Sequence, residues 1–139
     1  MPVTGRPAPV PAHGTVLLVE DSSEVAEVTV TLVEQLGYRV VRAANAADAL
    51  RHLQDGAKID LVFSDIVMPR AMNGIALASA CRERFPDIAV PLTTGFTDAA
   101  QAPDVRFDIL RKPFELSALQ RAIDAALRAR RREARTKIG

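Results

Sequence analysis

Apolar and polar residues alternate along the chain in blocks that predict strands separated by helices. The continuous apolar run over 15–19 is typical of a strand buried on both faces of a sheet. Apolar residues at helical spacing follow over 22–36, and Gly37 ends that helix. The pattern then repeats, predicting strands at 38–41, 61–63, 88–92 and 107–110 and helices at 45–56, 74–85 and 115–130.

Strands that alternate with helical crossovers predict an α/β fold. It is a single doubly wound sheet of five parallel strands with helices on both faces. The fourth helix is expected to be shortened, because Gly95 loosens the start of its segment and Pro103 would remove a helical hydrogen bond. About one turn remains possible there, which is too short to be stable alone. We therefore expect residues 96–105 to be short or irregular and mobile.

The length of 139 residues suits one domain with tails. Residues 1–13 hold four of the nine prolines, and we interpret them as a flexible arm or linker. We interpret residues 14–131 as the domain and residues 132–139 as a basic tail. The chain has a net charge of +1, but residues 14–127 hold 11 basic and 16 acidic groups, a net charge of −5. The folded part is therefore acidic, which argues against nucleic acid as a partner.

Composition excludes several other classes of protein. The single cysteine, Cys81, excludes an internal disulfide framework, and we expect it to pack in the core. No apolar run approaches the roughly 18 residues of a membrane span, and no secretory signal is visible at the start. We therefore expect a cytoplasmic protein that binds no membrane and is a monomer.

Polar residues follow the predicted strands at the points where parallel strands present their carboxyl ends. These are Glu20 and Asp21 after the first strand, Asp65 after the third, Thr94 after the fourth and Lys112 after the fifth. Ligand sites in such sheets lie outside the carboxyl ends of the strands. We therefore expect three carboxylates, a hydroxyl and an ammonium to share one pocket.

Three crowded carboxylates repel one another unless a cation lies between them. Oxygen ligands of this kind suit Mg²⁺, which binds a few carboxylates and keeps several waters. A carboxylate beside a metal ion and a lysine is also a suitable acceptor for a phosphoryl group. The residues therefore point to an aspartyl phosphate as the covalent product.

Five motifs, in this order, resemble the receiver domain of two-component response regulators. They are Val-Leu-Leu-Val-Glu20-Asp21, Ser-Asp65-Ile-Val-Met68-Pro69, Asn73-Gly74, Thr94-Gly95 and Lys112-Pro113-Phe114. The resemblance covers roughly residues 14–128. The chain is most similar to C-terminal receivers of bacterial hybrid sensor histidine kinases. The features that carry this similarity are the Glu-Asp pair, the second motif and the shortened fourth segment.

The resemblance implies a flavodoxin-like, CheY-like fold with strand order 2-1-3-4-5. It implies that Asp65 accepts a phosphoryl group from a histidine kinase or a histidine phosphotransfer domain. The implied Mg²⁺ ligands are Asp65, Asp21, Glu20 through a water, and the backbone carbonyl of Val67. Thr94 would be the switch hydroxyl and Lys112 the partner of the phosphoryl group, while Met68, Pro69 and Pro113 shape the surrounding loops.

The chain departs from the common pattern of the family at several positions. Glu20 stands where many members have Asp, and the loop after Pro69 is one residue longer. Ile109 stands where many members have an aromatic switch residue. We therefore expect phosphorylation to act locally and not to drive dimerisation through the fourth segment.

Four alternative functions stay open at this point. An aspartyl-phosphate phosphatase or phosphotransferase is one, although dehalogenase-type enzymes would need a second acid where this chain has Val67. A flavin or mononucleotide binder would need a glycine-rich or hydroxyl-rich phosphate loop, and the acidic Glu20-Asp21 pair disfavours it. A stand-alone receiver acting as a phosphorelay shuttle is the third. A transcription factor is the fourth, and no second domain follows residue 131. The domain itself is expected not to be an enzyme, whether or not its parent protein is a histidine kinase.

Overall fold

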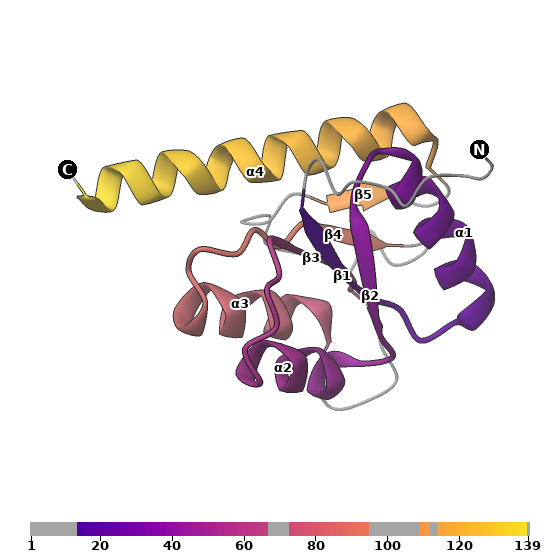
Figure 1. The fold of residues 1–139 in the computed structure, drawn as a ribbon, viewed down its shortest axis with the longest axis horizontal. Helices are drawn as coiled ribbons and strands as arrows, with labels where there is room; N and C mark the ends of the chain where they lie inside the picture. Colours follow the sequence, from indigo (N-terminus) through magenta and orange to yellow (C-terminus); the bar gives the residue numbers. More distant parts are fainter. Residues whose placement is uncertain (1–13, 67–72, 95–108, 112–113, 139) are drawn as a thin grey trace, which may run out of the picture.

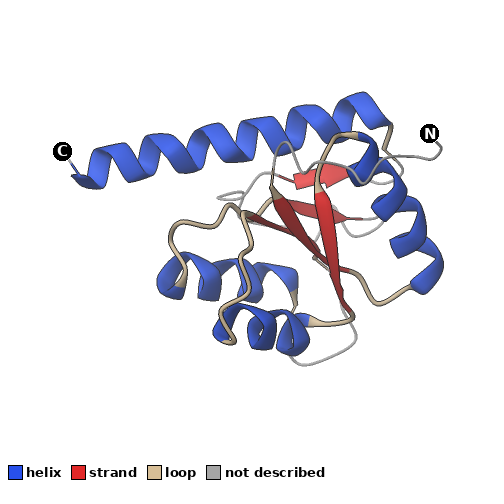
Figure 2. Ribbon diagram, viewed as in Figure 1, coloured by secondary structure: helices blue, strands red, loops and turns tan. Residues whose placement is uncertain are grey.

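The computed structural model describes residues 14–66, 73–94, 109–111 and 114–138, which form one parallel sheet with helices on both faces (Figures 1 and 2). Its strands are β1 (Thr15–Val19), β2 (Arg39–Ala43), β3 (Leu61–Asp65), β4 (Leu92–Thr94) and β5 (Ile109–Arg111). Its helices are α1 (Ser23–Gln35), α2 (Ala46–Gln54), α3 (Gly74–Arg84) and α4 (Leu116–Ile138). The strand order is β2-β1-β3-β4-β5, all pairs being parallel, which confirms the predicted fold class.

The apolar runs lie in the middle of the sheet. All five residues of β3 are buried, as are the last four of β1, because helices cover both of their faces. The edge strand β2 instead exposes Arg39 and Arg42. Charged side chains on an edge strand discourage pairing with another chain.

Side chains that alternate along the strands divide the core into two layers. Val16, Leu18 and Phe63 pack with α1 and α4 on one face of the sheet. Leu17, Val19 and Val62 pack on the other face in a cluster that includes residues of α2 and α3. This period of two is what a strand buried on both faces requires. Cys81 lies in the second cluster and is fully buried, as the sequence predicted.

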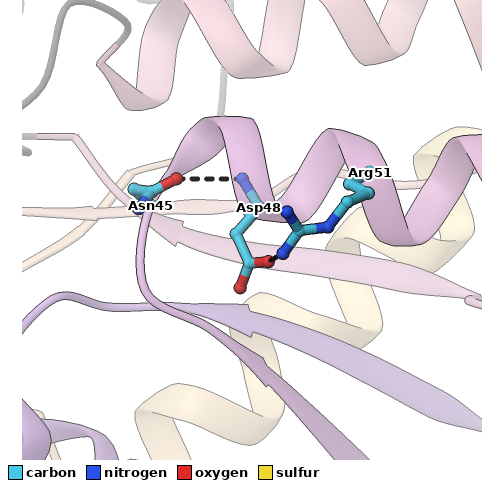
Figure 3. A network of polar contacts seen from close by, with 3 residues as sticks. All are labelled: Asn45, Asp48 and Arg51. Carbon is cyan, nitrogen blue, oxygen red and sulfur yellow. Dashed lines mark hydrogen bonds and ion pairs between the residues drawn. The ribbon is translucent and has the colours of Figure 1, made fainter.

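Three of the helices begin at a residue whose side chain accepts a backbone hydrogen bond. Ser22 caps α1, Asn45 caps α2 and Asn73 caps α3. The Oδ1 of Asn45 accepts from the amide of Asp48 at 2.9 Å, which confirms the cap predicted from the sequence (Figure 3). The carboxylate of Asp48 also forms an ion pair with Arg51, one turn further along α2 (Figure 3).

Two boundaries differ from the sequence predictions by more than two or three residues. β4 begins at Leu92 and not at residue 88, although Ala89 already forms an isolated bridge with Leu61. Pro91 explains the late start, since it has no amide hydrogen to donate to a neighbouring strand. α4 continues to Ile138, beyond the predicted end near 130, because arginine and alanine favour helix and basic residues suit its negative end.

The predicted shortening of the fourth helix, over 96–105, lies outside the described residues. Residues 107 and 108 of the predicted fifth strand also lie outside them, and the strand is seen at Ile109–Arg111. No helix in the described part of the chain is both long and apolar enough to cross a membrane.

Candidate functional site

Three carboxylates gather at the carboxyl ends of β1 and β3. Glu20, Asp21 and Asp65 each offer an oxygen, and these oxygens all lie within 4.8 Å of one another. Glu20 and Asp65 are each only 7% exposed, whereas Asp21 is open to solvent. The structure therefore brings together the three acidic residues that the sequence singled out.

The register of the sheet explains why these side chains meet. Val19, the last residue of β1, is paired with Ser64 of β3, so the next residues along both strands, Glu20 and Asp65, are neighbours. The amide of Glu20 donates to the carbonyl of Ala43 at 3.0 Å, which prolongs the pairing of β1 with β2. The Oε2 of Glu20 accepts from the amide of Ser22 at 3.2 Å. That bond holds the carboxylate at the beginning of α1.

Backbone hydrogen bonds fix the chain on either side of Asp65. The hydroxyl of Ser64 donates to the carbonyl of Asp65 at 2.9 Å, and the amide of Ile66 donates to the carbonyl of Thr93 at 2.9 Å. The carbonyl of Ile66 in turn accepts from the amide of Gly74 at 2.8 Å. The end of β3 is thus bonded to β4 and to the first residue of α3 within one residue of Asp65.

Sequence reasoning did not find the positioning roles of Ser64 and Gly74. Asn73-Gly74 entered only as part of the family resemblance, and an isolated serine before an aspartate carries no signal. Gly74 is buried against the backbone of Asp65 and Ile66, with no space for a side chain. A glycine at the beginning of a helix that follows an acidic strand end is the signal that could have suggested such a close approach.

β4 ends in two neighbouring threonines, Thr93 and Thr94. Thr93 is buried, and its hydroxyl donates to the carbonyl of Leu110 in β5 at 2.8 Å. That hydrogen bond engages the hydroxyl of Thr93 with β5. Thr94, the predicted switch hydroxyl, is the last residue of β4, and its role stays a prediction.

The remaining predicted site residues lie outside the described residues. These are Val67, Met68, Pro69, Lys112 and Pro113. β5 ends at Arg111, directly before Lys112, on the edge of the sheet where β1 and β3 end. The roles assigned to these five residues stay predictions.

The donor set at the site fits Mg²⁺. Three carboxylates supply hard oxygen ligands, and this ion prefers a few carboxylates together with waters. Crowded carboxylates repel one another, and a divalent cation bound among them would offset that repulsion. The chemistry of the donors therefore fits a divalent cation.

Comparisons with known proteins agree with this geometry. The sequence model of the response regulator receiver domain matches residues 16–124. The chain is 36% identical over 116 residues to the response regulator receiver protein CpdR of Brucella abortus, covering 81% of this chain and 95% of CpdR. It is also 36% identical over 118 residues to the sensor kinase CckA of the same organism, but it spans only 12% of CckA.

A solved structure shows the same fold. The receiver domain protein from Clostridium thermocellum has a TM-score of 0.75 and 27% identity, and the match covers 86% of this chain and 98% of that one. The family model spans well over half of the chain, and CpdR is matched over nearly its whole length. This chain therefore belongs to the response regulator receiver domains of two-component signal transduction.

Proposed function

We propose that Asp65 is the phosphoacceptor of this receiver domain and takes its phosphoryl group from a phosphohistidine of a kinase or phosphotransfer domain. The observation that carries the proposal is the gathering of Glu20, Asp21 and Asp65 at the carboxyl edge of the sheet. A carboxylate oxygen of Asp65 attacks phosphorus, forming an O–P bond as the N–P bond breaks. The leaving imidazole nitrogen keeps the electron pair of the broken bond.

Glu20, Asp21 and Asp65 are the described residues that would hold Mg²⁺, with the carbonyl of Val67 completing the set. The ion, when bound, supplies positive charge that neutralises the oxygens of the transferring phosphoryl group. The carboxylate of Glu20 already accepts from the amide of Ser22, so we assign it an outer role through a water. Asp21, which is exposed, is assigned direct ligation.

Thr94 and Lys112 are assigned the recognition of the phosphoryl group. A threonine hydroxyl donates one hydrogen bond to a phosphoryl oxygen, and a lysine ammonium offsets its charge. Met68 and Pro69 shape the loop that follows the acceptor, and Pro113 directs Lys112. The hydrogen bond from Thr93 to Leu110 supports this division, since it keeps the neighbouring hydroxyl away from the site.

We assign no turnover of a separate substrate to the domain. It would transfer a phosphoryl group onto and off its own aspartate, in the cytoplasm, where a single buried cysteine needs no oxidising compartment. An aspartyl-phosphate phosphatase or phosphotransferase is the alternative, and it would show catalytic turnover of a phosphate ester.

The similarity to CckA supports an origin within a hybrid sensor kinase. The coverage of CpdR along 95% of its length supports the second candidate, a stand-alone receiver that passes the phosphoryl group along a phosphorelay. The reading frame upstream of Met1 distinguishes them, because a hybrid sensor kinase would carry a kinase core encoded there.

The test of the phosphoacceptor is the Asp65→Asn variant, incubated with radiolabelled acetyl phosphate and Mg²⁺ beside the wild type. We expect alkali-labile label on the wild type and none on the variant, with an unchanged circular dichroism spectrum. Asp55→Asn is the matched control, since Asp55 is an exposed aspartate at the end of α2. Stoichiometric label on Asp65→Asn would exclude Asp65 as the acceptor.

A further inference from the structure

α1 and α4 cover the same face of the sheet and contact each other (Figure 1). A hollow of about 180 Å³ lies where the end of α1, the segment before β2 and α4 meet. It is lined by Leu36, Tyr38, Gln120, Ile123 and Asp124. Ile123 is fully buried and Tyr38 is 8% exposed, whereas Gln120 is open to solvent. The hollow therefore opens at the surface, and part of its wall belongs to the core.

The hollow lies at the opposite end of α1 from the acidic cluster of Glu20, Asp21 and Asp65. α1 begins at Ser23, two residues after Asp21, and Leu36 follows its last residue as the cap. The 13 residues of this helix span about 20 Å. An occupant the size of a side chain would therefore leave the acidic cluster uncovered.

One residue of the lining carries a charge that has no partner in the described part of the chain. Asp124 is half-buried, and its carboxylate forms no hydrogen bond or ion pair with another described residue. Arg121 and Arg128, its neighbours along α4, do not pair with it. The apolar walls at Leu36 and Ile123 suit the stem of a long cationic side chain, and the carboxylate suits its charge.

The segment that precedes the domain begins beside this hollow. The carbonyl of Gly14 accepts from the amide of Arg39 at 2.9 Å, and Arg39 directly follows Tyr38 in the chain. Successive Cα atoms are about 3.8 Å apart. Residues 1–13, which we call the arm, therefore start within a few ångströms of the backbone of a residue that lines the hollow.

The arm carries the charge that the hollow lacks. It contains one arginine, Arg6, and no aspartate or glutamate. Pro7, Pro9 and Pro11 favour an extended chain with a rise of about 3.1 Å per residue, so the segment from Arg6 to Gly14 spans up to about 25 Å. Packed helices lie about 8–10 Å apart, so this reach is sufficient to pass the end of α1 and arrive at α4.

We propose that the arm folds back onto its own domain and places the side chain of Arg6 in the hollow, with its guanidinium against the carboxylate of Asp124. The net charge of −5 over residues 14–127 attracts a basic arm. The prolines reduce the conformational entropy that the arm loses when it binds. The segment that the sequence suggested to be a flexible linker would then join α1 to α4.

The tether favours the chain's own arm over other occupants. A short linker gives a tethered group an effective concentration in the millimolar range, so even a weak ion pair is populated. Arg6 of a second copy, or a free organic cation, carries the same charge but lacks that advantage. Both would have to displace the arm that is already attached beside the hollow.

The test compares the full wild-type chain with Arg6→Glu, Asp124→Lys and the combination of the two. Tyr38 is the sole tyrosine and the chain has no tryptophan, so tyrosine fluorescence reports on this hollow alone. Acrylamide should quench it about twofold more strongly in each single variant, because reversing one charge of the pair releases the arm. The combined variant should return to the wild-type value, because the two charges are exchanged.

Nuclear magnetic resonance gives a second readout that depends on the arm itself. Arg6→Glu should shift the backbone amide resonances of Gln120 and Asp124, which are far from residue 6 in the sequence. Asp55→Lys is the matched control, since it changes the net charge as Asp124→Lys does, at an exposed aspartate. It should leave the fluorescence and these resonances unchanged. Labelling of Arg6→Glu by acetyl phosphate should also keep the wild-type rate, because the hollow is remote from the acidic cluster.

Three results would overturn the proposal. The first is Arg6→Glu with wild-type quenching and unshifted resonances at Gln120 and Asp124. The second is a combined variant that stays as strongly quenched as the single ones, which would separate Arg6 from Asp124. The third is a set of resonance shifts that grows with protein concentration, which would place the arm of one chain on another.

Discussion

Gly74, the first residue of α3, lies so close to the backbone of Asp65, the last residue of β3, that no side chain fits between them. A Cβ on Gly74 would stand 2.9 Å from the carbonyl carbon of Asp65 and 2.8 Å from the Cα of Ile66, and it would clash with the Asp65 carbonyl oxygen. All three atoms belong to the backbone, so they cannot turn away as a flexible side chain could. The amide of Gly74 also donates to the carbonyl of Ile66 at 2.8 Å. α3 is thereby seated directly on the strand end that carries the proposed phosphoacceptor.

The variant Gly74→Ala should therefore disturb the site as well as the fold. We expect a loss of about 1–3 kcal/mol in the free energy of unfolding, as for other insertions into tightly packed positions. We also expect slower labelling by acetyl phosphate, because α3 must move away from Asp65 to admit the methyl group. Urea unfolding measures the first effect, and the initial rate of labelling measures the second.

Gly56→Ala is the matched control for Gly74→Ala. Gly56 follows α2 with a φ of +88° and has open space around its Cα, so alanine there strains the backbone without meeting any atom. The strain should cost about 1 kcal/mol of stability. Labelling should stay at the wild-type rate. Equal losses of labelling in both variants would show that stability alone, and not the contact with Asp65, governs the rate.

The beginning of α2 offers a direct comparison of a helix cap with a surface ion pair. Asn45→Ala should lower the free energy of unfolding by about 1 kcal/mol, because the amide of Asp48 loses its hydrogen-bond acceptor. Arg51→Ala should lower it by less than about 0.5 kcal/mol, because the Arg51 side chain is 70% exposed and the pair is screened by water. Urea unfolding of both variants checks the order, and a larger loss for Arg51→Ala would contradict it.

Cys81 should make the stability of the domain fall at alkaline pH. Burial raises the pKa of its thiol to about 11 from 9.0, with the charge of Arg84 opposing part of the rise. Between these two values the native state holds a proton that the unfolded chain releases. The free energy of unfolding should therefore be unaffected below pH 9 and fall by up to about 1.4 kcal/mol per pH unit above it.

Because other groups titrate in the same range, the measurement compares the wild type with Cys81→Ala at several pH values. The variant loses some packing at every pH, but its stability should fall less steeply above pH 9. Parallel curves for the two proteins would mean that the thiol does not contribute to the pH dependence.

The sequence predicted the sheet well because its signals are local. The apolar run of β1 and the cap at Asn45 each depend on a few adjacent residues, and both were confirmed. The clustering of Glu20, Asp21 and Asp65 also followed from local signals, since parallel strands present their carboxyl ends at one edge. Fold class and the acidic part of the site could therefore be predicted without a structure.

Features that depend on contacts between distant segments were not predicted. The approach of Gly74 to Asp65 requires the path of the backbone between β3 and α3, which composition does not reveal. The bond from Thr93 to Leu110 joins residues 17 positions apart, so no local pattern indicates that the hydroxyl of Thr93 is engaged with β5. The late start of β4 likewise depends on a distant segment, because the missing amide hydrogen of Pro91 matters only where a neighbouring strand would accept it.

The acidic cluster should make the stability of the domain depend on Mg²⁺. An ion that binds the native cluster and not the unfolded chain should add about 2.7 kcal/mol at one hundred times its dissociation constant. Asp21→Ala should remove most of that gain, because the exposed carboxylate of Asp21 is the one assigned to direct ligation. Glu20→Ala should remove less, since its carboxylate already accepts from the amide of Ser22. Urea unfolding with and without Mg²⁺ measures these differences, and Asp55→Ala should keep the full gain. Wild-type stability that does not respond to millimolar Mg²⁺ would contradict the metal site, whatever the outcome of phosphorylation.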